Sequence, residues 1–474
     1  MGWIDYEREP RSDIAFIDMK SFYASVECVE HGCHPLTTSL CVMSRSDNSN
    51  GLILAASPVF KKVFGKKNVG RSYDLPFNIH TRRFNYYVAK RQNLRTDPAY
   101  VHFIETWARK TLIVPPRMSL YIEKNMAIQN VLQNYSPKEE ILPYSIDEAF
   151  IDLTRSLDYF AKDKGASRKS VLDEVSARIQ YDIWRETGVF STIGMSNANP
   201  LLAKLALDNE AKYTSNMRAN WSYEDVETKV WKIKELTDFW GIGSRTAARL
   251  NRMKIHSIKE LANSNPELLK EEFGVIGLQL WFHANGVDES DIRYPYKAKA
   301  QGIGNSQVLP KNYYKQEDIE LVLSEMAEQV AIRLRRIHKK TTTIAIHVGF
   351  AVESEKKSIN AQRKIDPTQN TKVLIQHVLQ LFRDKYTGGA ARNIAVRYDN
   401  FVDENYSLIS LFDDLETIEK EETLEKTIDN IRERFGFLAI QNATVLKENS
   451  RSIARSKLVG GHSAGGAGGL DGLR

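Results

Sequence analysis

The chain has 474 residues, of which 42% are hydrophobic and 27% are charged. This balance is typical of a globular protein and excludes a wholly disordered, collagen-like or coiled-coil chain, and the length allows about three or four domains. The net charge is +6, although residues 403–434 contain eleven acids and only four bases. The rest of the chain is therefore basic, which favours a polyanionic partner such as nucleic acid.

The cysteines and the apolar runs indicate the cellular environment that is expected for the chain. Three cysteines cannot form a disulfide framework, so we expect a reducing, cytoplasmic environment. Cys28, His31, Cys33 and His34 lie close together, but no second pair of ligands follows them, so we do not expect a zinc site. We find no secretory signal and no run of about 18 apolar residues, and therefore expect no membrane span.

The first half of the chain alternates strand and helix patterns. The expected elements are a strand at 13–17, a helix at 21–30 with Ser21 as its N-cap, two short strands within 141–154, a helix at 168–186, a strand at 189–194 and a helix at 200–212. Strand–helix–strand–strand–helix–strand is the order of a ferredoxin-like split βαβ sheet. We expect this sheet in residues 12–27 and 78–215, with an insertion at 28–77.

The second half predicts further folded parts, so that the whole is an α+β multidomain protein. Residues 216–295 are helical with breaks marked by glycine, and 296–310 have the composition of a linker. Residues 300–425 mix helices and strands. A helix is expected at 415–435, with an apolar face of Leu424, Ile428, Ile431 and Phe435. Residues 426–474 form a tail that ends in a glycine-rich, partly disordered segment.

Three acidic residues stand at the ends of expected strands. Asp18 ends an apolar strand, and Asp147 and Glu148 lie in the turn of an apolar hairpin. Each acid alone fits a helix cap or a hydrophilic turn. At one edge of a sheet, however, three carboxylates could bind two divalent ions that activate a 3′-hydroxyl. Neighbours on a regular strand face opposite ways, so Asp147 and Glu148 can both reach such ions only if the backbone turns there.

Six segments in chain order carry a resemblance to a known family. They are FIDMKSFYASVE (16–27), LAASPVFKKVFG (54–65), YSIDEAFIDLT (144–154), TIGMSNANPLLAKLALDNEAK (192–212), GIGSRTAARL (241–250) and QGIGNSQVL (301–309). Together they resemble a Y-family (UmuC/DinB-type) translesion DNA polymerase, with a closer likeness to the UvrX subgroup, over about residues 12–450. The resemblance implies a catalytic palm at 12–27 and 78–215, fingers at 28–77, a helix-hairpin-helix thumb at 216–295, a little finger at 300–425 and a tail at 426–474.

The resemblance also implies an activity and its partners. A translesion polymerase of this kind adds dNTPs to a primer 3′-OH opposite damaged template in the DNA damage (SOS) response, without proofreading. We expect a monomer that binds primer–template DNA, two Mg²⁺ ions and a sliding clamp. By the family motif, Asp18, Asp147, Glu148 and the carbonyl of Met19 bind the metal ions.

Further residues are assigned by the same resemblance. Tyr23 matches the steric gate that excludes a 2′-hydroxyl, with Phe22 beside it, although both would otherwise be ordinary helix core. Lys62 matches a triphosphate contact, although a lysine in such a pair is more often simply solvated. Segment 408–412 (Leu408, Ile409, Ser410, Leu411 and Phe412) resembles a clamp-binding peptide with Leu408 in place of Gln, and would otherwise be a buried strand.

Two segments are candidates for contacts with the DNA backbone. Gly241 and Gly243 allow a tight turn before a helix whose N-terminus can meet a phosphate, and Arg245 follows them. An ordinary turn between two helices, with no contact to DNA, fits this segment about as well. The basic segment 331–340 ends a helix and would otherwise be a solvated face. It contributes Arg335, Arg336, Lys339 and Lys340.

The chain also departs from the family pattern. Lys20 and Val59 stand where many relatives carry an acid and a tyrosine, and Asn199–Pro200 replaces Asn-Lys, so the usual triphosphate lysine is missing. Residues 79–112 are extra. These departures keep open a non-catalytic DNA- or clamp-binding regulator derived from the same fold. A nucleotidyl cyclase shares the carboxylates but has no use for the turn or for the basic segment.

Overall fold

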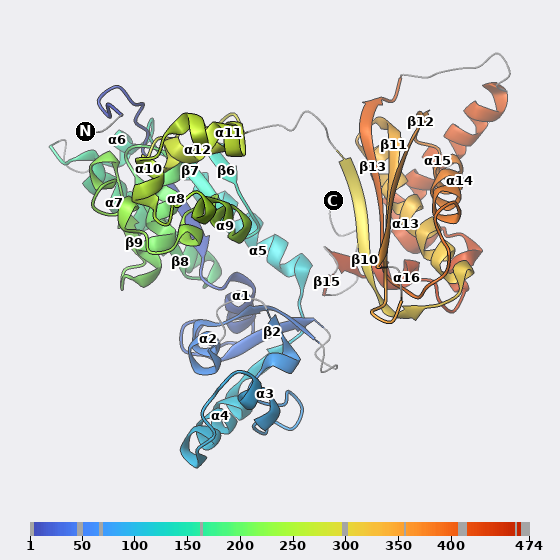
Figure 1. The fold of residues 1–474 in the computed structure, drawn as a ribbon, viewed down its shortest axis with the longest axis horizontal. Helices are drawn as coiled ribbons and strands as arrows, with labels where there is room; N and C mark the ends of the chain where they lie inside the picture. The colour runs from blue at the N-terminus through green and yellow to red at the C-terminus, as the bar shows by residue number, and fades with distance from the viewer. Residues whose placement is uncertain are drawn as a thin grey trace. The chain divides into compact units, whose positions relative to one another are not determined.

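The computed structural model describes residues 4–44, 51–65, 70–161, 165–295, 302–354, 357–405, 415–459 and 462–465. The chain divides into two compact units, both drawn in Figure 1. The first unit comprises residues 1–116 and 120–296, and the second comprises 117–119 and 297–474. No described helix is long and apolar enough to cross a membrane.

A five-stranded sheet in the order β6-β7-β1-β8-β9 forms the centre of the first unit. Its strands are β1 (Ile14–Met19), β6 (Ile141–Pro143), β7 (Glu148–Asp152), β8 (Ser191–Ser196) and β9 (Arg218–Asn220). β1 is antiparallel to both of its neighbours, β7 and β8. Apart from the added edge strand β9, this is the strand order of a split βαβ sheet.

Local signals explain where the helices of this sheet begin and end. α8 (Pro200–Asn209) starts at Pro200, and the side chain of Asn199 caps it by accepting a hydrogen bond from Leu202 N. α7 (Arg168–Thr187) is capped by Ser167 and ends at a left-handed glycine. α8 can lie close to β8 because Gly194 has no side chain: a Cβ there would lie 2.1 Å from the carbonyl oxygen of Ala203.

α1 (Phe22–Glu30) begins as expected, but Ser21 does not cap it. Ser21 has a φ of 50° and its hydroxyl makes no cap hydrogen bond. The hydroxyl instead accepts a hydrogen bond from Lys61 Nζ at 3.0 Å. The expected cap is therefore wrong, and Ser21 ties α1 to the following part of the chain.

A second, smaller sheet in the order β4-β3-β2-β5 follows α1. It contains β2 (Leu40–Ser44), β3 (Leu52–Ala56), β4 (Gly70–Arg71) and β5 (Leu112–Val114), with α2 (Pro58–Phe64), α3 (Tyr86–Arg91) and α4 (Pro98–Lys110). Phe60, Phe77, Phe84 and Ile104 share one core in this part. Residues on both sides of the expected boundary at residue 77 therefore pack in one core with this sheet.

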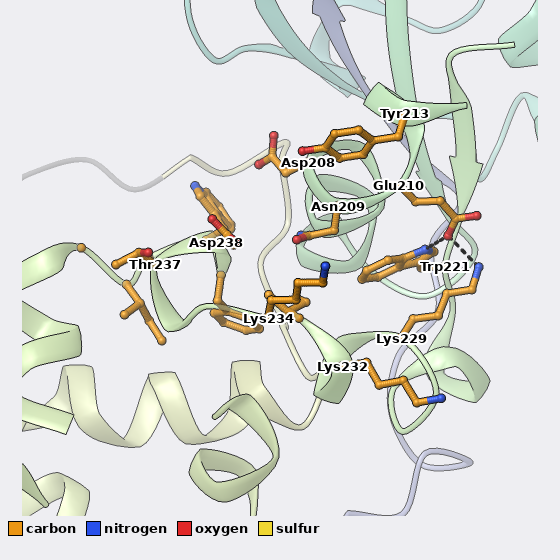
Figure 2. A pocket seen from close by; sticks show the side chains of 16 residues that line it. Asp208, Asn209, Glu210, Tyr213, Trp221, Lys229, Lys232, Lys234, Thr237 and Asp238 are labelled. Carbon is orange, nitrogen blue, oxygen red and sulfur yellow. Dashed lines mark hydrogen bonds and ion pairs between the residues drawn. The ribbon is translucent and has the colours of Figure 1, made fainter. Parts of the chain in front are cut away.

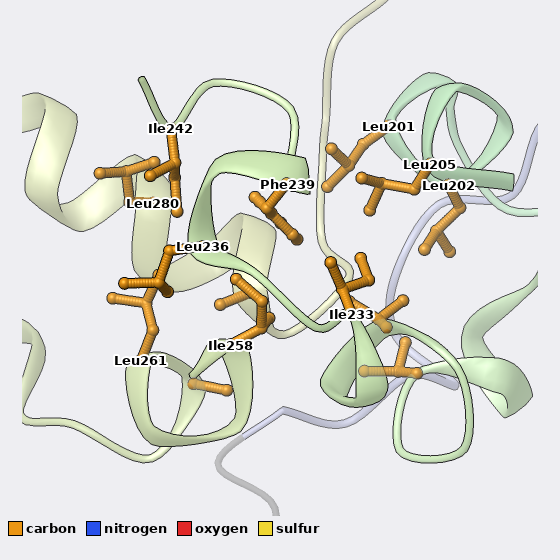
Figure 3. Packing of buried hydrophobic residues seen from close by; sticks show 14 of the residues in the cluster. Leu201, Leu202, Leu205, Ile233, Leu236, Phe239, Ile242, Ile258, Leu261 and Leu280 are labelled. Atoms are coloured by element: carbon orange, nitrogen blue, oxygen red, sulfur yellow. The ribbon is translucent and has the colours of Figure 1, made fainter. Parts of the chain in front are cut away.

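Short helices complete the first unit and pack on α8. They are α9 (Ser244–Arg252), α10 (Ile258–Ala262), α11 (Pro266–Phe273) and α12 (Val275–Ala284). Figure 3 shows the shared core, in which Leu201 and Leu205 of α8 face Phe239 and Ile233, with Leu280 deeper in the helical part. Burial of this continuous apolar surface fixes the helical part to the end of the large sheet. α5 (Met118–Leu132) and α6 (Leu157–Phe160) are the other α-helices of this region.

The second unit is a four-stranded antiparallel sheet in the order β10-β13-β11-β12. Its elements are β10 (Gly302–Tyr313), β11 (Lys339–Phe350), β12 (Ser358–Thr368), β13 (Ala391–Asp403), α13 (Gln316–Arg336) and α14 (Thr371–Arg383). Ile344, Val348, Ile394 and Val396 form a core with both helices. Residues 302–310 are part of β10, so the linker expected at 296–310 is wrong for those residues.

The chain that follows this sheet contains α15 (Leu415–Phe435), α16 (Ser452–Ser456), β14 (Leu458–Val459) and β15 (His462–Ser463). On the apolar face expected for α15, Leu424 is 58% exposed and Phe435 is 70% exposed, whereas Ile428 and Ile431 are half-buried. The buried side chain of Arg455 pairs with Glu325 of α13 at 2.8 Å. Part of the expected tail is therefore folded onto the sheet domain.

Candidate active site

The three acids singled out in the sequence meet at one end of the large sheet. Asp18 lies in β1, directly opposite Glu148 of β7 in the antiparallel register. The backbone nitrogen of Met19 donates to the carbonyl oxygen of Asp147 at 2.9 Å. Directly opposed residues in an antiparallel pair have Cα atoms about 5 Å apart. Carboxylates that are far apart in the chain are thus neighbours.

The backbone turns at Asp147, as the two adjacent acids require. β7 starts only at Glu148, and residues 145–147 form a bend before it. The backbone nitrogens of Tyr144 and Ser145 both donate to the carbonyl oxygen of Glu148, at 2.9 and 3.0 Å. Asp147 therefore lies outside the regular strand, and the alternation of strand faces does not separate it from Glu148.

The carboxylates carry the electrostatic signature of crowded like charges. Burial raises the pKa of Asp18 to about 6, and Asp147 and Glu148 push that pKa in the same direction. Burial also raises the pKa of Asp147, with a further contribution from Glu148. Partly buried carboxylates at close quarters favour any cation that can lie between them.

Two lysines on the α8 side of the site neutralise part of this charge. Lys204 Nζ lies 2.9 Å from Glu148 Oε1 and 3.3 Å from Asp208 Oδ2. Lys212 Nζ lies 3.4 Å from Asp18 Oδ2 and 2.7 Å from Asp208 Oδ1. Burial lowers the pKa of Lys212, but Asp18 and Asp208 outweigh that effect and raise it. Lys212 and Asp208 were missed in the sequence, although their i,i+4 spacing was visible.

The oxygen donors fit Mg²⁺ by their chemistry. Mg²⁺ takes carboxylate oxygens and completes its coordination with water and substrate phosphates. Within the described residues, no three His, Cys, Asp or Glu side chains are already arranged around a metal position. Lys204 and Lys212 each pair with one oxygen of Glu148 and Asp18, and the second oxygen of each carboxylate would be available to a metal ion.

An aromatic stack lies beside the carboxylates. Tyr23 in the first turn of α1 stacks on Tyr121 of α5, with ring centroids 4.3 Å apart and planes inclined by 13°. Tyr121 is fully buried, and its hydroxyl donates to Glu27 Oε1 at 2.8 Å. Burial raises the pKa of Tyr23, and the negative charge of Asp147 raises it further. Phe22 is only 2% exposed and belongs to the protein core.

The two adjacent lysines of α2 differ in their exposure to solvent. Lys62, the residue matched to a triphosphate contact, is exposed. Lys61 is half-buried and donates to Ser21 Oγ. Burial lowers the pKa of Lys61, while Asp18 acts in the opposite direction. Lys61 is therefore the lysine that faces the carboxylates. The sequence alone could not show which of the two adjacent lysines does so.

A hollow of about 1250 Å³ separates the end of α8 from the glycine turn. Figure 2 shows Asp208 and Tyr213 at the top, Thr237 and Asp238 at the left, and Lys234 lower, near the centre of the view. Three lysines and three acids are among the residues that line it: Lys229, Lys232, Lys234, Asp208, Glu210 and Asp238. One end of the hollow thus reaches Asp208, the partner of both active-site lysines.

The glycine turn at the other side of this hollow is open. Gly241 has a φ of 95°, and Gly243 is the N-cap of α9. A Cβ on either glycine would meet no atom within 4 Å, so an outside group can approach the backbone there. Arg245 is exposed in the first turn of α9. The first helix expected before this turn is only a 3₁₀ turn at Leu236–Asp238.

In the second unit, the cations of the basic segment form ion pairs with acidic side chains. Arg335 is 10% exposed and lies 2.6 Å from Asp429 and 3.4 Å from Glu425 of α15. Lys340 is 8% exposed and lies 3.9 Å from Glu422. These ion pairs hold Arg335 and Lys340 against α15, and the expected phosphate contact of the two residues stays a prediction.

The other two expected contacts in this segment are more accessible. Arg336 pairs with Glu433 at 3.4 Å and Lys339 pairs with Asp403, and both cations are about 40% exposed. Surface ion pairs of this kind are weak and exchange readily. The expected clamp-binding peptide at 408–412 lies outside the described residues.

Comparison with known proteins places the chain in a family. Three family profiles match: the impB/mucB/samB family at residues 84–208, the IMS family HHH motif at 223–255 and the impB/mucB/samB family C-terminal domain at 300–411. The chain is 35% identical to the "Putative UV-damage repair protein UvrX" of Bacillus subtilis over 97% of its own length and all of that protein.

Two polymerases show a similar extent of likeness. The chain is 30% identical to "DNA polymerase IV 2" of Halalkalibacterium halodurans and also to that of Bacillus subtilis, over 95% of its own length and 98% of each relative. The family profiles follow the chain from the large sheet through the glycine turn to the second unit. Sequence matches of this length, over a fold that gathers the three acids, show that the chain belongs to the impB/mucB/samB (IMS) family of Y-family DNA polymerases.

Proposed function

We propose that the chain is a template-directed translesion polymerase that transfers nucleotides from dNTPs to a primer 3′-OH. The observation that carries this proposal is the register of β1 and β7, which sets Asp18 opposite Glu148 with Asp147 beside Met19. Its relatives include proteins named for DNA polymerase IV and for repair of UV damage. The proposal includes synthesis opposite damaged template in the DNA damage response.

Asp18, Asp147, Glu148 and the carbonyl of Met19 are the groups that would hold Mg²⁺. When bound, two such ions activate the attacking hydroxyl and neutralise charge on the transferring phosphorus. The protein's own contribution is to hold these carboxylates close together in a partly buried site, where electrostatic interactions are strong.

The lysines supply the positive charge that a triphosphate needs. The negative charge of Asp18 acts to raise the pKa of both Lys61, from α2, and Lys212, from the segment after α8. We assign the triphosphate to these two lysines and retain Lys62 only as an outer contact, because Lys62 is exposed. This assignment fills the gap left by Asn199–Pro200, where relatives carry a lysine.

Tyr23 is the proposed steric gate. Its ring is held in one orientation by Tyr121, so a sugar lying on the opposite face of that ring would meet a fixed aromatic surface. A 2′-hydroxyl would require the ring to move. Because the Tyr121 hydroxyl is bound to Glu27, the stack cannot easily shift away.

DNA contacts are proposed for the glycine turn and for its hollow. Gly241 and Gly243 leave the backbone open, and Arg245 adds an exposed cation. Contacts of this type bind phosphates without reading sequence. The clamp-binding role of residues 408–412 is retained as a proposal based on sequence alone.

Primer extension with Mg²⁺ and all four dNTPs, on undamaged and lesion-bearing templates, tests the proposal. The wild-type chain should extend, and Asp147→Asn and Glu148→Gln should each lose nearly all of that activity. Glu139→Gln is the matched control, because Glu139 is exposed and lies in the turn Lys138–Glu140, outside the strands β1 and β7. Full activity in Asp147→Asn or Glu148→Gln would refute the metal assignment.

One observation favours a second candidate, a non-catalytic DNA-binding regulator. Glu148 and Asp18 are both bound by lysines, which is the arrangement expected of a site that never takes a metal ion. The same assay separates the two candidates. A regulator would bind primer–template DNA but would add no nucleotide at any Mg²⁺ concentration.

A further inference from the structure

The part of the chain inserted between β4 and β5 presents aromatic rings to solvent. Tyr73, Tyr86 and Tyr87 are 48%, 60% and 75% exposed. The core of this region is built without them, from Phe77, Phe84 and other apolar residues. Three exposed tyrosines in one short region therefore need an explanation other than folding.

The rings alternate with cations in a fixed pattern. Tyr87 and Arg91 are four residues apart on α3 and lie on one face of the helix, as do Tyr86 and Lys90. The Arg91 guanidinium lies 5.9 Å from the centre of the Tyr73 ring and also pairs with Asp74. Tyr73, Arg91 and Tyr87 thus form a continuous row, with Tyr86 and Lys90 beside it; we call these five residues the tyrosine row.

Local contacts hold the tyrosine row rigid. The side chain of Gln92 donates to the carbonyl oxygen of Asp74 at 2.9 Å, which ties the end of α3 to the turn that carries Tyr73. The Tyr86 ring packs edge-on against Phe84 at 5.0 Å. A surface that is ordered before binding loses little conformational entropy when a ligand stacks on it.

The charge around the row favours an anion. Residues 70–110 contain eight lysines and arginines but only three acids. Each acid is paired with an arginine of the same segment, namely Asp74 with Arg91, Asp97 with Arg95 and Glu105 with Arg109. This short region therefore carries a net charge of +5, although the whole chain carries only +6 because other segments are acidic.

Exposed rings and cations together fit one class of ligand. Single-stranded nucleic acid offers unstacked base faces for the tyrosines and phosphates for the cations, whereas a duplex hides its base faces. The row is also physically linked to the candidate active site. The Phe77 ring packs at a tilt against Phe64 of α2, with centroids 4.8 Å apart, and α2 carries Lys61, which donates to Ser21 Oγ.

We propose that the tyrosine row binds the unpaired template strand ahead of the active site. This inference rests on the proposed polymerase function, because only a template-directed enzyme holds an unpaired strand there. It gives the exposed tyrosines and cations between β4 and β5 a purpose that the family resemblance does not supply. Bases stack on Tyr73 and Tyr87 while Lys90 and Arg91 neutralise the backbone.

Equilibrium binding of the full chain to labelled primer–template DNA, without dNTP, tests this proposal. The template carries a 5′ overhang of either one nucleotide or about 12 nucleotides, within the range that single-strand sites cover. Fluorescence anisotropy at one fixed salt concentration gives the ratio of the two affinities. The wild-type chain should prefer the long overhang, and Tyr87→Ala or Tyr73→Ala should reduce that preference about tenfold.

Two variants control for loss of folding and for general effects. Tyr87→Phe keeps the stacking ring and should behave as wild type. Tyr159→Ala removes an equally exposed tyrosine outside the row and should leave the preference unchanged. Equal binding of both overhangs by wild type, or a Tyr87→Ala variant with the wild-type preference, would overturn the proposal.

The outcome is independent of the catalytic test. Weakening of both complexes to the same degree by Tyr87→Ala would show that the row binds duplex DNA, and that too would overturn the proposal. A chain that prefers the long overhang but never extends a primer would refute the polymerase function alone. An active polymerase that shows no overhang preference would refute the tyrosine row alone.

Discussion

The Tyr121 ring lies face to face with the Tyr23 ring, 4.3 Å between centroids, and its hydroxyl is bound to the buried Glu27. The proposed steric gate is therefore one of two stacked rings, anchored from behind by a buried carboxylate. Tyr121 itself has no exposed surface, so it acts on the substrate only by positioning Tyr23.

This relationship predicts the behaviour of two substitutions. Tyr121→Leu removes the stacked ring and should lower the ratio of dNTP to rNTP incorporation, by less than Tyr23→Ala does. Tyr121→Phe keeps the ring and should retain most of the discrimination. The ratio of kcat/KM values for the two sugars is the measurement, because a general loss of folded protein cancels from it. An unchanged ratio in Tyr121→Leu would show that Tyr121 does not contribute to the steric gate.

The raised pKa of Asp18 predicts a dependence of stability on pH. In the folded chain this pKa is about 6, against an ordinary value of 3.8, so folding favours the protonated acid. In the absence of Mg²⁺, wild-type stability should fall as the pH rises from about 4 to 6. Asp18→Asn lacks this titration and should be more stable than wild type at pH 7, by up to about 3 kcal/mol.

Thermal unfolding at pH 4 and pH 7 measures this difference. Added Mg²⁺ should raise the melting temperature of wild type at pH 7 more than that of Asp18→Asn, because the ion binds the ionised carboxylate of the folded state. Equal stability of the two proteins at both pH values would contradict the raised pKa.

The ion pairs of Arg335 predict a structural role. Arg335→Leu leaves Asp429 and Glu425 with an uncompensated, largely buried negative charge and should destabilise the second unit by about 3 kcal/mol. The slope of DNA affinity against salt should stay unchanged. Arg245→Ala should have the reverse effect, lowering that slope by about one unit with little change in stability. If Arg335→Leu lowered the slope of DNA affinity against salt, that result would show that Arg335 contacts a phosphate.

The pair between Arg455 and Glu325 predicts that the C-terminal segment supports the second unit. Both side chains are almost fully buried, and the desolvated guanidinium has its pKa lowered to about 10. Arg455→Met should cost about 3–5 kcal/mol in urea unfolding of the full chain, because Glu325 keeps its buried charge. The double variant Arg455→Met with Glu325→Leu should regain much of that loss. Unchanged unfolding in Arg455→Met would contradict the buried pair.

The strand and helix order of the large sheet could be predicted because apolar runs and turn residues mark each element. The position of Asp18 at the end of its strand followed from the same pattern. The sequence of β10 predicts a linker because an edge strand rich in Gly, Ser and Asn lacks the apolar alternation that marks strands. The bend that lets Asp147 and Glu148 face one site was required by the chemistry but had no local signal.

Contacts between residues that are far apart in the chain are the main features that the sequence could not predict. The sequence could not show that Lys61, and not Lys62, faces the carboxylates, because that choice depends on where α2 packs. The sequence predicts an apolar face on α15 but not the ion pairs of Glu425 and Asp429 with Arg335, which hold this helix to α13. Charged pairs of this kind leave no periodic pattern, since an acidic helix face looks the same whether solvent or arginine covers it.

Single-nucleotide incorporation tests the central claim most directly. A primer–template, Mg²⁺ and the one complementary dNTP are mixed with wild type, Glu148→Gln or the Glu139→Gln control, and primer elongation is followed in time. The account predicts elongation by wild type and by the control, and a loss of at least about a hundredfold in Glu148→Gln, because one lost ligand weakens the charge stabilisation of the transferring phosphorus. Elongation by Glu148→Gln at the wild-type rate would contradict it.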